Sequence, residues 1–200
     1  MLRQTFGFCK AAATDTHLSE KQTARQMDII YLEQEWDPHA GRVFDLDERH
    51  VIKCYTPFTD RDPRDMMEDE HQLATMLSKR GYPVAAPSTC VVVQGSISGF
   101  GLVMEKIYGQ DIEQMEQTAK LKIAKEHISI LEGIIDIGIS PTDFFLRNAI
   151  YGHTQSDPTS KLYLTGLSLW RRAPPLWMLR ETREQLKSYR KHICVQGCFS

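Results

Sequence analysis

The sequence predicts an α+β protein in which a β-rich half with one helix precedes a helical half. Short apolar runs and polar-apolar alternation at the strand period dominate residues 29–55, whereas apolar residues recur at helical spacing through residues 118–137. The chain has 200 residues, of which 42% are hydrophobic and 25% charged. That composition supports one compact domain or two small lobes that share a cleft.

Five strands are expected in the first half. Residues 29–32 form a β-type run, residues 42–46 alternate, and a polar turn leads into a third strand over residues 51–55, so these three strands predict an antiparallel start. Two further strands, over residues 90–93 and 101–105, flank a hairpin-like segment. The first half is therefore expected to hold a five-stranded antiparallel sheet.

One helix is expected to interrupt these strands. After a linker rich in Pro and Asp, apolar residues recur at spacings of three and four until Gly81. The second half is expected to contain a long core helix over residues 118–137, two short strands over 149–151 and 161–164, and a last helix over about 176–193. The residues expected to face inward from that last helix are Leu176, Leu179, Leu186 and Tyr189.

Charge and composition exclude several functions. Lys and Arg total 24 against 26 Asp and Glu, and this balance does not favour a nucleic acid or an anionic membrane as partner. No apolar stretch approaches the roughly 20 residues that cross a bilayer. Residues 1–27 lack a secretory pattern and are expected to be a mobile leader, which predicts an intracellular, cytoplasmic protein. The five cysteines are odd in number and are expected to be reduced thiols.

A lysine and a glutamate stand out in the first half. Lys53 ends the apolar run Val51-Ile52-Lys53, and Glu70 lies on the expected helix with Leu73 and Leu77 at i+3 and i+7. Because residues at those spacings share a helix face, Glu70 is expected to face the sheet. The competing carboxylates, which lack apolar partners in phase, are Glu68 and Asp69.

The order of elements, together with Val51-Ile52-Lys53 in a strand, resembles the protein kinase superfamily, which includes the aminoglycoside phosphotransferases. The resemblance spans roughly residues 28–170. It implies a two-lobed fold, with an N-lobe over residues 28–107 and a shortened helical C-lobe over residues 108–200. It also implies that Lys53 contacts the α- and β-phosphates of ATP while Glu70 holds the lysine in place.

The same resemblance extends to the segment between the lobes. The strand that ends in Met104 resembles the one that enters the kinase hinge, where backbone groups pair with adenine. Met104 would take the gatekeeper place, and Glu105 and Ile107 would belong to the nucleotide-binding hinge. Residues 109–112 resemble the turn that opens the helical lobe.

The segment after the long helix resembles a kinase catalytic loop. Asp143 is followed five residues later by Asn148, the spacing used in that superfamily. The resemblance implies that Asp143 accepts or orients the proton of the substrate hydroxyl and that Asn148 helps to hold Mg²⁺. The expected cofactors are therefore ATP and Mg²⁺.

Several positions depart from the family pattern. Pro141 and Thr142 replace the usual His-Arg or His-Gly pair, and Phe145 replaces a lysine that often steadies the γ-phosphate. Gly41 is the one glycine where a phosphate-covering loop usually has three. Leu164 stands where the family has a metal-binding aspartate, and a leucine cannot bind a hard cation. A nearby carboxylate that would have to substitute is Asp157.

Three functions follow. A degenerate kinase would bind ATP, transfer phosphate weakly or not at all, and act on a protein partner. An active minimal phosphotransferase would use the same residues on a hydroxyl acceptor. An unrelated α+β interaction module would bind neither ATP nor a hydroxyl acceptor. Lys53 and Glu70 would then be surface charges, and His127 would be a core histidine. Asp143 and Asn148 would cap turns.

Two tryptophans near the last helix also have two interpretations. Trp170 and Trp177 flank Arg171-Arg172 and a Pro-Pro pair. They are either packing aromatics or a partner-binding edge exposed by the short C-terminal half.

Overall fold

The structure is a computed structural model. Most of the predicted leader and the glycine at position 41 lie outside the residues that it describes. Within those residues the protein has three α-helices and a five-stranded mixed sheet, which confirms the α+β class. The described ranges are 27–32, 43–56, 61–96, 98–112 and 115–197.

The five strands of the sheet lie in the order β1-β4-β5-β3-β2. The β2–β3, β3–β5 and β4–β5 pairs are antiparallel, whereas β1 runs parallel to β4. One face of the sheet buries an apolar cluster that includes Ile52, Val91 and Val103. The strand bounds are β1 Asp28–Leu32, β2 Val43–Asp45, β3 His50–Tyr55, β4 Pro87–Gly95 and β5 Gly99–Glu105.

The prediction of an entirely antiparallel sheet is wrong at β1. Instead of lying beside β2, β1 joins the opposite edge of the sheet, with Ile30 in register with Val93 of β4. Ile30 and Leu32 thereby pack on the apolar cluster of the sheet, and Leu32 is buried. A strand pattern does not name its neighbour, because pairing depends on which apolar face is left to cover.

Helix α1 (Pro63–Lys79) covers one face of the sheet, and it confirms the helix expected there. The Asp62 side chain accepts a hydrogen bond from the Arg64 N–H, and Pro63 occupies the first turn, where its missing N–H is harmless. Residues of α1 that are buried against the rest of the protein are Met67, Glu70, Leu73, Ala74 and Leu77.

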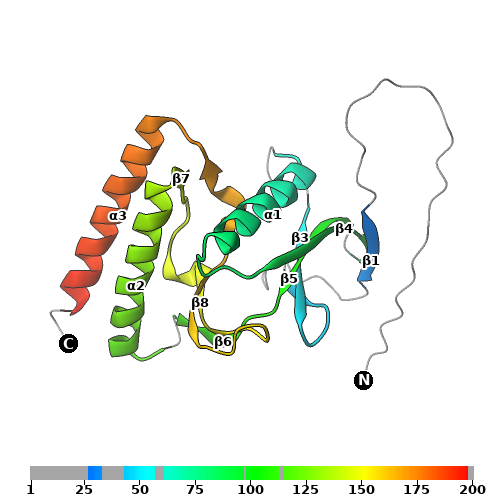
Figure 1. Cartoon of the computed structure of the whole chain (residues 1–200), viewed down its shortest axis with the longest axis horizontal. Coiled ribbons are helices and arrows are strands. Elements are labelled where there is room, and N and C mark those ends of the chain that lie inside the picture. The colour runs from blue at the N-terminus through cyan, green and yellow to red at the C-terminus, as the bar shows by residue number, and fades with distance from the viewer. Residues whose placement is uncertain (1–26, 33–42, 57–60, 97, 113–114, 198–200) are drawn as a thin grey trace.

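The second half is built on two neighbouring helices, α2 (Gln117–Asp136) and α3 (Leu176–Gly197), which Figure 1 shows side by side. The long predicted helix is therefore confirmed. The largest apolar cluster joins these helices to α1 through residues such as Leu77, Leu131 and Leu186.

Short elements connect α2 to α3. Strands β8 and β9 confirm the two predicted short strands, but the segment predicted as a turn over residues 109–112 is wrong. Residues 109–111 belong to β6, which pairs with β8, and Ile112, which follows the strand, is fully buried. The bounds are β6 Tyr108–Asp111, β7 Ile139–Ser140, η2 Leu146–Asn148, β8 Ala149–His153, β9 Lys161–Leu164, η3 Leu167–Leu169 and β10 Arg171–Arg172.

The inward face of α3 is only partly as predicted. Leu186 is buried, and Leu179 and Tyr189 pack on the core, but Leu176 is 73% exposed. The stripe that α2 and β7 cover runs through Thr182, Leu186 and Ile193, and at 100° per residue Leu176 lies well outside it. None of the helices in the described ranges is long and apolar enough to cross a membrane.

Candidate functional site

The predicted lysine and glutamate meet beneath α1. Lys53 Nζ donates to both carboxylate oxygens of Glu70, at 2.9 Å to Oε1 and 2.6 Å to Oε2. The side chains are 16% and 3% exposed, respectively. Strand alternation sends Lys53 toward α1, while its neighbours Ile52 and Cys54 face the cluster on the other side of the sheet. A buried carboxylate is tolerated because it is paired and hydrogen-bonded.

Tyr55 completes this group and was not singled out from the sequence. Its hydroxyl donates to Glu70 Oε2 at 2.6 Å, and Lys53 Nζ lies 5.3 Å from the centre of its ring. Burial, followed by the negative charge of Glu70, raises the pKa of Tyr55 well above its usual value. The available signal was the i+2 spacing from Lys53, which places both side chains on one face of the strand.

The predicted hinge residues lie at the end of β5 and directly after it. Met104 is partly buried against the cluster of Tyr55, Met67 and Leu102. The backbone N–H of Glu105 donates to the Ala86 carbonyl, whereas Ile107 is partly exposed. Next to Glu105, the N–H of Lys106 donates to the Arg49 carbonyl at 2.7 Å.

The Glu105 side chain is hydrogen-bonded to Ser156. Its carboxylate accepts hydrogen bonds from the Ser156 N–H and hydroxyl, both at 2.9 Å. Burial alone would raise the pKa of Glu105, but the Ser156 hydrogen bonds outweigh it and lower the pKa. A cavity of about 560 Å³ lies here, lined in part by Arg49, His50 and Ser156.

The Asp143–Asn148 loop is held tightly by its own polar groups. Asn148 Nδ2 donates to the Asp143 carbonyl at 2.6 Å, and Arg147 Nη2 donates to Asp143 Oδ1 at 2.6 Å. Asp143 has φ of +21°, a conformation that non-glycine residues rarely adopt. Strained backbone of this kind clusters at functional sites, which makes this loop a candidate functional site.

Asn148 also contacts the segment that follows β9. The Thr165 N–H donates to the Asn148 carbonyl at 2.8 Å. Gly166 has φ of +72°, and a Cβ added there would lie 3.1 Å from Asn148 Cγ. A glycine is required at this position both by its backbone conformation and by the close approach of the asparagine.

The metal-binding aspartate expected from the family pattern has no counterpart at Leu164. Leu164 is 2% exposed and belongs to the main apolar cluster, and its N–H donates to the Pro83 carbonyl. Asp157 is engaged elsewhere, because it accepts from Lys161 Nζ at 2.7 Å and from the Thr159 N–H. The Lys161 hydrogen bond lowers the pKa of Asp157.

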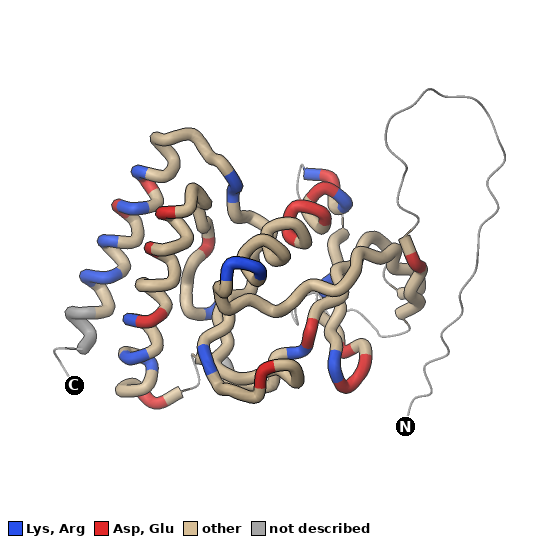
Figure 2. The backbone as a smooth tube through the Cα atoms, in the orientation of Figure 1, with Lys and Arg blue, Asp and Glu red and all other residues tan. Residues whose placement is uncertain are grey.

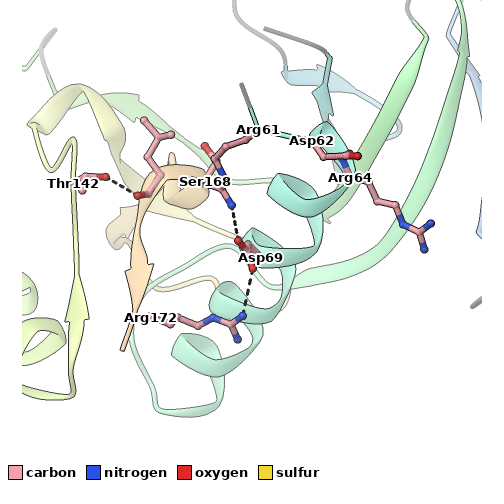
Figure 3. A network of polar contacts seen from close by, with 8 residues as sticks. Arg61, Asp62, Arg64, Asp69, Thr142, Ser168 and Arg172 are labelled. Atoms are coloured by element: carbon pink, nitrogen blue, oxygen red, sulfur yellow. Dashed lines mark hydrogen bonds and ion pairs between the residues drawn. The ribbon is translucent and has the colours of Figure 1, made fainter. Parts of the chain in front are cut away.

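The two competing carboxylates on α1 face away from Lys53. Glu68 accepts from Arg64, and Asp69 accepts from Arg61 at 2.6 Å and from Arg172 at 3.4 Å. Figure 3 shows Asp69 between these two arginines, so that α1 is tied to β10.

The backbone around η3 is tied down in the same region. Arg61 also donates to the Ser168 carbonyl, and Thr142 donates to the Leu169 carbonyl at 2.8 Å, as Figure 3 shows. The segment after Gly166 is therefore connected both to Arg61, which precedes α1, and to the loop that holds Asp143.

The structure thus brings the predicted residues into two groups. Lys53 and Glu70 form one, with Tyr55, and Asp143 and Asn148 form the other, next to Gly166. Comparison with known proteins adds no relative: no protein-family model matches the chain, and no curated protein matches its sequence.

Proposed function

We propose that this protein is a degenerate member of the protein-kinase-like superfamily that binds ATP and transfers phosphate weakly or not at all. The observation that carries the proposal is the buried ion pair between Lys53 and Glu70. The two residues are 17 positions apart and come from a strand and a helix, so that their pairing is a tertiary contact rather than a local one.

The pair leaves a donor for a phosphate. An ammonium group has three N–H bonds, and two of those of Lys53 point to Glu70. The third is available to an anion at the partly exposed end of the side chain. Glu70 fixes the position of the ammonium, and Tyr55 fixes the carboxylate, so the charge is oriented before a nucleotide arrives.

Asn148 supports the metal-binding part of the proposal. Its amide nitrogen is used by the Asp143 carbonyl, which leaves the side-chain oxygen as an acceptor. Amide oxygens are suitable ligands for Mg²⁺, so Asn148 would help to hold the ion, which would supply positive charge to neutralise the phosphates.

Two features argue for weak phosphate transfer. Leu164 offers no oxygen where the family has a metal-binding aspartate, and the carboxylate of Asp143 is paired with Arg147. Phosphoryl transfer relies on metal ions and positioned charges to stabilise its transition state, so the loss of one metal carboxylate weakens it strongly.

The proposed adenine site is the backbone after β5. The N–H groups of Glu105 and Lys106 already donate within the protein. An adenine ring would therefore use neighbouring backbone groups, including those of Ile107, with Met104 beside it.

A thermal-shift assay tests nucleotide binding directly. ATP with Mg²⁺ or Mn²⁺ is expected to raise the melting temperature of the native protein by mass action, and Lys53→Ala is expected to abolish that rise. Lys79→Ala, an exposed lysine on α1, is the matched control and is expected to retain it.

Lys53→Ala also removes the cation from a buried carboxylate and lowers the melting temperature without ligand. The ligand-induced rise is therefore the quantity to compare, together with direct titration of a fluorescent ATP analogue at a temperature where every variant is folded. An absent rise and absent binding in the native protein would exclude the ATP-binding function, and binding that survives Lys53→Ala would place the nucleotide elsewhere.

An active minimal phosphotransferase is the second candidate, and one observation favours it. The Asp143 side chain remains 35% exposed in a loop whose backbone is held by Asn148. Release of ADP that depends on an added hydroxyl compound, and that Asp143→Asn abolishes while ATP binding persists, would establish this activity. ATP binding without such turnover supports the degenerate form.

A further inference from the structure

One side of helix α3 is exposed and is covered by no other element in the described part of the chain. The buried stripe of α3 includes Thr182, Leu186 and Ile193. The helix packs chiefly against α2 and β7. At 100° per residue, the opposite side of the helix carries a set of exposed residues that we call the α3 outer stripe. The apolar and charged members of the stripe are Leu176, Trp177, Arg180, Glu181, Glu184, Lys187 and Lys191.

The charged part of this stripe is only partly neutralised. Arg183 and Arg190, at the edge toward α2, pair with Asp136 and Glu132. On the stripe itself, Lys187 pairs with the exposed neighbour Glu184. Figure 2 shows the resulting concentration of Lys and Arg along α3.

Two basic side chains of the stripe have no such partner. Arg180 and Lys191 form no ion pair with any residue in the described part of the chain. They flank Lys187 on the same side of the helix, about one and two turns away. Three basic side chains against the carboxylates of Glu181 and Glu184 leave the stripe with a net positive charge, and a partner with carboxylates can pair with Arg180 and Lys191.

The N-terminal end of the stripe is apolar. Leu176 and Trp177 are 73% and 62% exposed, although large apolar side chains are usually covered in soluble proteins. Trp170 is 6% exposed and belongs to the core, which confirms the packing interpretation for that residue, whereas Trp177 remains exposed. Trp177 and Arg180 are three positions apart, and tryptophan and arginine are among the residue types that contribute most binding energy at protein interfaces.

We propose that the α3 outer stripe docks an acidic, amphipathic segment of a partner protein. An apolar side chain of the partner packs on the exposed surface of Leu176 and Trp177, and its carboxylates pair with Arg180 and then with Lys187 and Lys191 along the helix. This surface lies outside the residues used for nucleotide binding, so the two proposals stand independently.

Charge and geometry favour a protein segment over other anionic partners. A helix that lies in a membrane surface carries apolar residues along its whole outer length, whereas here they occupy only the first turn. A nucleic-acid surface would need a stronger positive field than a chain with formal charge of -2 provides, and Glu184 interrupts the stripe.

Fluorescence anisotropy with a labelled synthetic peptide tests the proposal. The probe is a short peptide of alternating Glu and Leu or Phe, and its match is the same peptide with Gln in place of Glu. We expect the acidic peptide to bind the full chain, and Arg180→Glu/Lys187→Glu to weaken binding at least about tenfold, which is about 1.4 kcal/mol. Trp177→Ala is expected to weaken it as well, with less change in salt dependence.

The matched control is Lys122→Glu/Lys125→Glu, which reverses two exposed charges on α2. It is expected to bind the acidic peptide as the native chain does. Circular dichroism checks that every variant is folded. Equal loss in the control, equal binding of the Gln peptide, or no binding of either peptide would overturn the proposal.

The same variants distinguish an acidic protein segment from other possible binding partners of the stripe. Binding of phosphatidylserine vesicles or of a DNA duplex in place of the peptide, or concentration-dependent self-association that Arg180→Glu/Lys187→Glu removes, would also overturn it. In each of those cases the stripe serves a membrane, a nucleic acid or a second copy rather than an acidic protein segment.

Discussion

The Lys53–Glu70 pair and the Asp143–Asn148 loop, two candidate functional groups, differ in how they are held. Glu70 is nearly fully buried and receives three short hydrogen bonds from Lys53 and Tyr55. The Asp143 carboxylate is partly exposed, has Arg147 as its partner four residues away, and sits on a strained backbone.

This difference predicts that the two groups contribute differently to the stability of the fold. Removing one member of a buried, hydrogen-bonded pair is costly for the fold itself, whereas a partly exposed pair contributes little. Leu164, where the kinase resemblance implies a metal-binding aspartate, is in register with Ala149 beside the second group. Under the proposed function, nucleotide anchoring would depend on the first group and phosphate transfer on the second, so that the two would be separable by mutation.

The largest expected effect is on the buried pair. Glu70→Ala removes the acceptor of both Lys53 and Tyr55 and leaves a partly buried ammonium without a counter-charge. We expect the free energy of unfolding to fall by about 3–5 kcal/mol, measured by urea denaturation. Glu68→Ala, which removes an exposed pair with Arg64, is the control and is expected to lower it by less than about 1 kcal/mol. Equal losses would show that burial of the pair adds nothing.

His127 makes the second half sensitive to acid. This histidine of α2 is buried, its Nδ1 has no hydrogen-bond partner within the described residues, and burial lowers its pKa to about 4. The unfolded chain, with a pKa near 6.5, therefore takes up a proton that the folded chain does not. Stability should be unaffected above pH 6.5 and should fall between pH 6.5 and 4, by up to about 3 kcal/mol.

Urea unfolding of the native chain and of His127→Phe across this pH range measures the effect. Carboxylates contribute their own acid dependence to both proteins, so the difference between the two curves isolates the histidine. A difference that stays constant between pH 7 and pH 4.5 would contradict the buried, neutral state of His127.

A smaller effect is expected from the tyrosine that holds Glu70. Tyr55→Phe keeps the ring and removes the hydroxyl, so that one oxygen of a buried carboxylate loses a donor. We expect a loss of about 1–3 kcal/mol in the free energy of unfolding. Tyr31→Phe, at an exposed position, is the control and should have no measurable effect. If Tyr55→Phe is neutral too, Lys53 alone is sufficient to hold the carboxylate.

The smallest effect is expected at Arg147. Its pair with Asp143 is between partly exposed side chains, so Arg147→Ala should change the free energy of unfolding by less than about 1 kcal/mol. In an ADP-release assay, a gain in phosphate transfer would show that Arg147 restrains Asp143. A large loss of stability would instead show that the loop is as important to the fold as the buried pair.

Local patterns were sufficient for several parts of the fold and of the candidate site. The helical spacing of Leu73 and Leu77 identified Glu70 as the inward-facing carboxylate among three neighbours, and the structure confirms that choice. Helix α2 was predicted to within a residue of its ends because its apolar positions recur over five turns. The kinase-like arrangement and ATP binding stay predictions.

Other parts depended on contacts that no local pattern encodes. Trp170 and Trp177 have similar sequence surroundings, yet one is buried and the other exposed, because only Trp170 lies where η3 meets the core. The role of Tyr55 became visible only when α1 was placed over β3, since its partner is 15 residues away.

By itself the sequence determined the three helices, most of the strands and which face of α1 is buried, because these depend on the periodicity of apolar side chains along one element. Only the tertiary structure decided that β1 runs parallel to β4, that Tyr55 donates to Glu70, and that the outer side of α3 is left bare. Those outcomes depend on which surfaces remain to be covered once all the elements are packed together, and that is a property of the whole chain.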